Sequence, residues 1–91
     1  MEPNHSALKT AFLVAFDSPK QAFYVLWIEA GGESFRVCKV SGAKGRIWHR
    51  QAWEFDSLSA AEALFEKRLR EKTRPDRRSN RKYQLQCVLP V

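Results

Sequence analysis

Alternating apolar and polar positions divide the first half of the chain into short runs that are typical of β-strands. Residues 8–16 are mostly apolar, and residues 22–30 are apolar on both of the faces that a strand presents. Residues 34–40 and 46–55 alternate between apolar and polar side chains. The pattern predicts four strands. The strand over residues 22–30 is expected at the centre of a sheet, covered at least in part on both faces.

Turn-forming residues separate these runs. Residues 17–20, Asp-Ser-Pro-Lys, favour a turn because Asp and Ser bond to the local backbone and Pro fixes φ. The pair Gly31 and Gly32 is typical of a two-residue hairpin turn, and residues 41–45 contain two further glycines. Four successive strands joined by short turns predict an antiparallel meander.

The second half of the chain begins with an amphipathic helix pattern over residues 59–72. Ser59 with Glu62 three residues later matches a capping box, which predicts the start of the helix at that serine. The helix is expected to end before Pro75, because the residue that precedes a proline avoids the helical region. Its apolar stripe, which is expected to pack on the sheet, consists of Ala61, Leu64, Phe65 and Leu69.

These elements predict an α+β fold in a single domain. Residues 83–88 alternate weakly and are expected to form a fifth strand or an ordered tail. We therefore expect a four- to five-stranded antiparallel sheet with one amphipathic helix packed on one face. Residues 1–7 are expected to be a flexible tail, and residues 8–91 are expected to form the domain, since 91 residues suffice for only one.

The net charge of +6 is concentrated in one segment. Nine of the sixteen Lys and Arg residues lie between Lys67 and Lys82, beside two acidic residues, and residues 74–82 are expected to form a basic loop. Such a segment indicates a polyanionic partner, either nucleic acid or an acidic protein. A membrane surface is disfavoured as a partner, because the apolar stripe of the basic helix is needed to cover the sheet.

No group of side chains has the spacing of a metal, redox or catalytic site. Cys38 and Cys87 lack C-x-x-C spacing, and His49 has no second His or acidic residue at ligand or relay spacing. We therefore expect a protein that is not an enzyme and that uses no metal or cofactor. The sequence shows no signal peptide and no run of about 18 apolar residues for a membrane span, which predicts a cytoplasmic protein with free, partly buried thiols.

The richest candidate for binding is the fourth predicted strand, which interleaves Trp and Arg. Trp48 has the chemistry to stack on a base while Arg46 and Arg50 hold phosphates; the alternative is that Trp48 covers a sheet or helix face. Trp27 and Trp53 lie in apolar alternation and are expected in the core. The residues predicted to bind nucleic acid are Arg46, Trp48, Arg50, Arg70, Arg74, Arg77, Arg78, Arg81 and Lys82.

Several short motifs occur in a specific order between residues 22 and 72. They are Phe-Tyr-Val-Leu at 23–26, Phe-Arg-Val at 35–37, Phe-Asp-Ser-Leu at 55–58, Ala-Ala at 60–61, Phe-Glu-Lys at 65–67 and Glu-Lys-Thr at 71–73. In this order and spacing the chain resembles a WGR domain, a small module of DNA-dependent poly(ADP-ribose) polymerases and of many bacterial proteins. The resemblance covers over half of the chain and implies the α+β fold and DNA binding.

The Trp-Gly-Arg triplet that names the family is not kept here. Its position falls on residues 40–42, Val-Ser-Gly, and Arg46 and Trp48 follow as a displaced substitute. The triplet's contact with a DNA end therefore does not transfer to this chain residue by residue. Our leading prediction is a WGR-like nucleic-acid-binding module, with DNA favoured through the resemblance. The alternative is an adaptor that binds an acidic protein.

Overall fold

The computed structural model describes residues 6–15, 21–74 and 83–90. Within them it contains five strands and one helix: β1 (Ser6–Val14), β2 (Ala22–Gly31), β3 (Ser34–Ala43), β4 (Arg46–Phe55), α1 (Leu58–Thr73) and β5 (Gln84–Pro90). β1 begins two residues before the predicted start at Leu8. The predicted turn over residues 17–20 lies outside the described residues, as does the predicted basic loop apart from Arg74.

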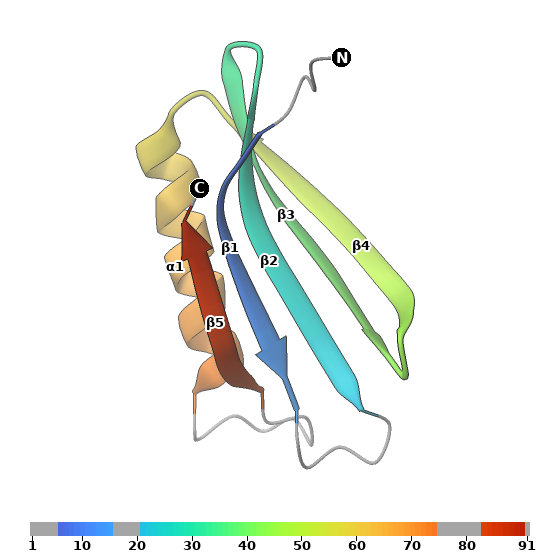
Figure 1. Ribbon diagram of the computed structural model, residues 1–91. Coiled ribbons are helices and arrows are strands. Elements are labelled where there is room, and N and C mark those ends of the chain that lie inside the picture. The colour runs from blue at the N-terminus through green and yellow to red at the C-terminus, as the bar shows by residue number, and fades with distance from the viewer. Residues whose placement is uncertain (1–5, 16–20, 75–82, 91) are drawn as a thin grey trace.

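The strands form one antiparallel sheet in the order β4-β3-β2-β1-β5 (Figure 1). This order confirms the predicted meander of four strands, and β2 is the central strand as expected. The fifth strand pairs with β1, so the last run is a strand and not a tail. Because β4 and β5 are the two opposite edges, α1 connects one edge of the sheet to the other as it packs across it.

Both hairpin turns differ from their predicted positions. The β2–β3 turn uses Gly32 and Glu33, with Gly32 at a φ of 63°, whereas Gly31 still belongs to β2. The β3–β4 turn consists of Lys44 and Gly45, at φ values of 54° and 78°. Two positive φ values in succession give the backbone twist that a two-residue hairpin needs. The predicted five-residue turn over residues 41–45 is therefore wrong, since residues 41–43 extend β3.

In the sequence Gly42 resembles a turn residue, but in β3 it has a packing role. The pairing of β3 with β4 shifts there: Ser41 lies opposite His49, and Gly42 lies opposite Ile47. Trp48 is thus an extra residue, and β4 bulges at this point. A Cβ atom on Gly42 would overlap the carbonyl oxygen of Arg46 and lie 2.8 Å from its carbon. The bulge therefore requires glycine at this position.

The N-cap of the helix lies two residues earlier than the capping-box pattern predicts. Ser57 is the N-cap, with an extended backbone and a side-chain oxygen that accepts from the Ala60 backbone N–H at 3.2 Å. Ser59 lies inside the first turn, so its predicted capping role is wrong. Within α1, Ala61 and Phe65 are fully buried, and the remaining apolar residues of the predicted stripe pack against the same core.

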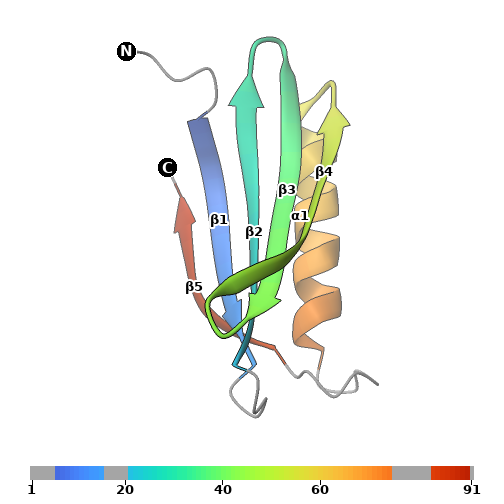
Figure 2. The same cartoon turned by 90° about the vertical axis from the view of Figure 1, so that its right-hand side faces the viewer.

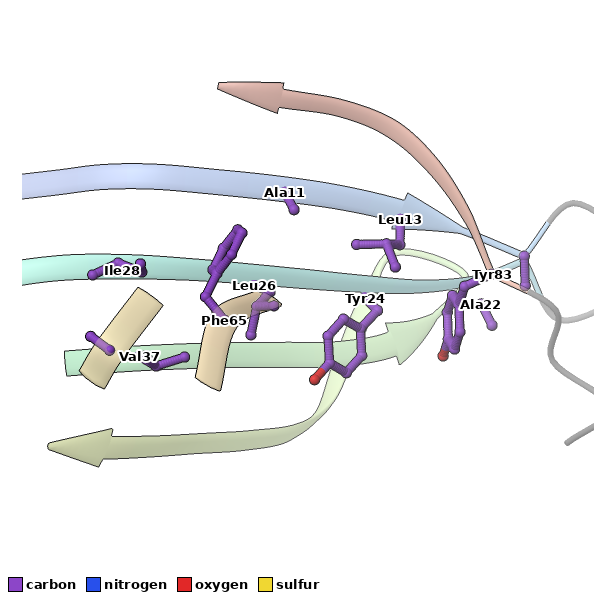
Figure 3. Close-up of a cluster of buried hydrophobic side chains, with 11 residues drawn as sticks. Ala11, Leu13, Ala22, Tyr24, Leu26, Ile28, Val37, Phe65 and Tyr83 are labelled. Atoms are coloured by element: carbon purple, nitrogen blue, oxygen red, sulfur yellow. The ribbon is translucent and has the colours of Figure 1, made fainter. Parts of the chain in front are cut away.

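The core lies between α1 and one face of the sheet, which we call the helix-side face. Figure 3 shows Phe65 beside Leu26, with Ile28, Val37 and Tyr24 along the neighbouring strands. Every second residue of β2 from Ala22 to Ile28 is buried there. The predicted packing of the helix stripe on the sheet is thus confirmed.

The opposite face of the sheet, the open face, has no described element packed over it (Figure 2). It carries half-buried side chains such as Phe12, Phe23 and Val25. Within the described chain, β2 is therefore fully covered on the helix-side face and only partly covered on the open face. Trp27, predicted in the core, lies on the open face, half-buried, and its indole N–H donates to Glu29 at 2.8 Å.

Three further predictions concern side chains at the margin of the core. Trp53 packs against the core as expected, but it is only half-buried. Both cysteines are free, as predicted. Cys38 is buried, and burial followed by the charge of Glu29 raises the pKa of its thiol to about 11. Cys87 is exposed, because it lies on the edge strand β5, so its predicted partial burial is wrong.

Candidate nucleic-acid interface

The edge strand β4 presents exposed aromatic and basic side chains next to one another. All residues from 44 to 52 are exposed. Trp48 at the bulge keeps 53% of its surface accessible, and Ile47 beside it keeps 45%. Arg46 and Arg50 form no ion pair with any described residue. This end of β4 therefore combines an accessible indole with two guanidinium groups whose charge is not compensated.

Because of the bulge, Arg46 and Arg50 lie on opposite faces of the sheet. Arg46 lies opposite Ala43, on the helix-side face, whereas Arg50 lies opposite Val40, on the open face. Strict alternation over residues 46–55 would place Arg46, Trp48 and Arg50 on one face, but alternation holds only in a strand without an extra residue. A ligand that contacts both arginines has to cross the edge of β4 at Trp48.

On the open face, Arg50 borders a shallow recess of about 400 Å³. Trp27, Cys38 and Val40 contribute apolar surface to this recess, and Arg36 contributes a second guanidinium. The Nε atom of Arg36 lies 3.7 Å from a carboxylate oxygen of Glu29, so its charge is partly compensated. The recess is thus mainly apolar, and Arg50 at its rim has no ion-pair partner among the described residues.

The second half of α1 carries the other predicted contacts that the structure describes. Arg70 and Arg74 are exposed, the first on the helix and the second at its C-cap. Arg70 does not pair with Glu66, because Glu66 accepts from Lys9 of β1 at 2.8 Å. The remaining predicted residues, Arg77, Arg78, Arg81 and Lys82, lie outside the described residues, and their role stays a prediction.

A cluster of cations that the sequence did not predict surrounds Tyr24 on the helix-side face. The Nε–H group of Arg68 donates to the Tyr24 hydroxyl at 3.1 Å. The ammonium groups of Lys39 and Lys72 lie 5.7 and 5.1 Å from the centre of the Tyr24 ring. These residues are far apart in the sequence. The available signal was Lys39, a cation two residues after Val37 on the face of β3 that should be apolar.

Within the described ranges, no three or more His, Cys, Asp and Glu side chains gather closely enough to hold a metal ion. The described helix is too short and too polar to cross a membrane. Comparison of the chain with models of known protein families finds no match, and comparison with curated proteins finds none either. The resemblance to WGR domains therefore stays a prediction.

Proposed function

We propose that this chain is a non-enzymatic nucleic-acid-binding module that favours DNA. The observation that supports the proposal most is Trp48, half-exposed at a bulge of an edge strand between Arg46 and Arg50. An accessible indole stacks on any base, because every base has a π-face, and guanidinium groups bind phosphate oxygens through charge-assisted hydrogen bonds. The preference for DNA rests on the resemblance to WGR domains.

The position of Trp48 suits a strand of nucleic acid that passes over the edge of the sheet. Arg46 on one face and Arg50 on the other can hold phosphates on both sides of a base that stacks on the indole. Exposed cations of α1, such as Arg70, extend the basic surface on the side of Arg46. Such contacts carry affinity with little sequence preference.

Fluorescence anisotropy with labelled duplex, nicked and single-stranded DNA, and with single-stranded RNA, tests this function. Binding is expected at about 50 mM salt, and the logarithm of the affinity should fall with the logarithm of salt by about 0.9 per phosphate contact on duplex DNA. Trp48→Ala should weaken binding by about 1–3 kcal/mol without changing this slope, because stacking depends little on salt.

Ile47→Ala is the matched control, since Ile47 is an exposed apolar neighbour on the same strand. It should change the affinity by less than about twofold. Equal losses of affinity in the two variants would contradict a stacking role of Trp48. If the unmodified protein binds none of the four nucleic acids at low salt, the proposed function is wrong.

A second candidate function is an adaptor that binds an acidic protein, and the open face favours it. Phe12, Phe23 and Val25 form a half-buried apolar surface there, beside the uncompensated charge of Arg50. Exposed apolar patches with a charged rim are typical of protein interaction sites. Calorimetric titration with an amphipathic peptide that has one acidic and one leucine-rich face tests this function. This function would be supported if the unmodified protein binds the peptide and Arg50→Glu abolishes the binding. A titration that shows no heat of binding would contradict it.

A further inference from the structure

The open face of the sheet carries apolar side chains in rows that run across the strands. One row crosses the whole sheet, and the register of the strands gives it Cys87, Phe12, Val25, Val40 and Arg50. Phe23 and Trp27 of β2 continue the apolar surface in the rows on either side. No described element packs over these rows (Figure 2). The open face is therefore a continuous apolar surface without a partner in the described chain.

The charged side chains of the open face balance one another. A row at one end of the sheet consists of Glu29, Arg36 and Glu54. Together with Arg50, these are the charged side chains that the register of the described strands places on this face, so two cations meet two carboxylates. The chain as a whole has a net charge of +6. An acidic partner gains little from a face without net charge, whereas two copies of this face can meet without net repulsion.

The area of the open face is sufficient for a specific interface. Its rows of side chains, spaced about 6.8 Å apart along strands that lie about 4.8 Å apart, cover about 650 Å² of the five-stranded sheet. Two such faces together bury about 1,300 Å², and specific interfaces bury about 1,200–2,000 Å². The composition also fits, because interface cores are enriched in aromatic residues and depleted of charged ones. Here Phe12, Phe23 and Trp27 lie inside the face, and the charged residues lie at its margin.

We propose that the open face binds the open face of a second copy of this chain, so that two sheets pack face to face in a symmetric dimer. Sheets that pack in this way lie about 10 Å apart, and their inner faces form a shared core. Each copy keeps α1 on its outer side, and Trp48 stays at the edge of β4. The dimer therefore leaves the proposed nucleic-acid interface accessible, and it does not depend on the proposed function.

Analytical ultracentrifugation over a range of protein concentrations tests the dimer. The unmodified protein should sediment as a dimer at about 100 μM, because an interface of this size reaches at least micromolar affinity. The double variant Val25→Thr, Val40→Thr should raise the dimer Kd by about tenfold or more, because each change places an unpaired hydroxyl in the interface twice. Threonine keeps the branched shape that suits a strand, and thermal unfolding verifies that the variant is folded.

Leu85→Thr is the matched control for the double variant. Leu85 is an exposed apolar residue opposite Leu13, on the helix-side face, so its replacement should change the dimer Kd by less than about twofold. A protein that stays monomeric at about 1 mM overturns the inference, since that concentration corresponds to the weakest measurable association. A dimer that Leu85→Thr weakens as much as the double variant overturns it as well.

Isotope-filtered nuclear Overhauser spectra of a mixture of labelled and unlabelled protein locate the interface without any substitution. Contacts between copies are expected among Phe12, Val25 and Val40. Contacts confined to α1 or to an edge strand overturn the inference. The acidic, leucine-rich peptide is the other possible occupant of this face. If the protein is monomeric and this peptide shifts the open-face resonances, the face belongs to the second candidate function and the inference is wrong.

Discussion

Gly42 determines where Trp48 lies, although the two residues are not paired. In the sequence Gly42 belongs to a glycine-containing segment that predicts a turn, and this prediction fails because glycine has two different uses. One use is a positive φ, as at Gly45; the other is room for a neighbouring backbone, as at Gly42. A single sequence does not distinguish them, so neither the bulge nor the opposite orientation of Arg46 and Arg50 could be predicted.

Replacing Gly42 by Ala is expected to destabilise the protein by about 1–3 kcal/mol, as overpacking does, because the added methyl group meets the backbone of Arg46. It should also displace the bulge and change the fluorescence of Trp48. Urea unfolding and emission spectra measure both effects. Gly45→Asn in the same hairpin is the control, since Asn tolerates a positive φ and nothing lies within 4 Å of the added Cβ. Equal losses of stability would contradict the role assigned to Gly42.

At the scale of the element, the sequence predicted the helix and its apolar stripe correctly, but not its N-cap. The apolar stripe was predictable because it repeats at the helical period and fits only one face. The cap was not, since Ser57 and Ser59 both precede an apolar run and only Ser59 has a glutamate three residues later. Ser57 has an extended backbone directly before the first helical residue, and this geometry makes Ser57 the N-cap.

Ser57→Ala is therefore expected to cost about 1 kcal/mol of the free energy of unfolding, the usual effect of losing an N-cap. Ser59→Ala should cost less than about 0.5 kcal/mol, because Ser59 lies on the exposed side of the first turn. Thermal or urea unfolding of the two variants measures the difference. A larger loss for Ser59→Ala would show that the capping box of the sequence pattern forms after all.

For the whole molecule, the order of the first four strands and the helix position followed from the sequence, but the place of β5 beside β1 and the extent of burial on each sheet face did not. The apolar residues of β2 on both faces predicted that both faces are covered at least in part. The chain has a single helix pattern, which supplies one layer, and Phe23, Val25 and Trp27 are left half-buried on the other face. The cation cluster at Tyr24 also escaped prediction, because β3 and α1 meet only in the folded chain.

The basic segment after α1 is expected to add positive charge to the whole binding surface. It is not expected to recognise a specific sequence. Replacing Arg74, Arg77 and Arg78 by Ala should weaken binding to all DNA sequences alike and flatten the salt dependence, by about 0.9 in slope for each phosphate that these arginines neutralise. Anisotropy titrations at several salt concentrations measure this slope. An unchanged slope would mean that these arginines contact no phosphate.

The central claim is that nucleic acid binds at the bulged edge of β4 and on the helix side of the sheet. Amide chemical shifts of the labelled protein, recorded while a short DNA is added, test it most directly. We predict that the largest shifts occur from Arg46 to Arg50 and in the second half of α1, around Arg68. Shifts confined to the open face, around Phe12 and Val25, or the absence of any shift at low salt, would contradict the account.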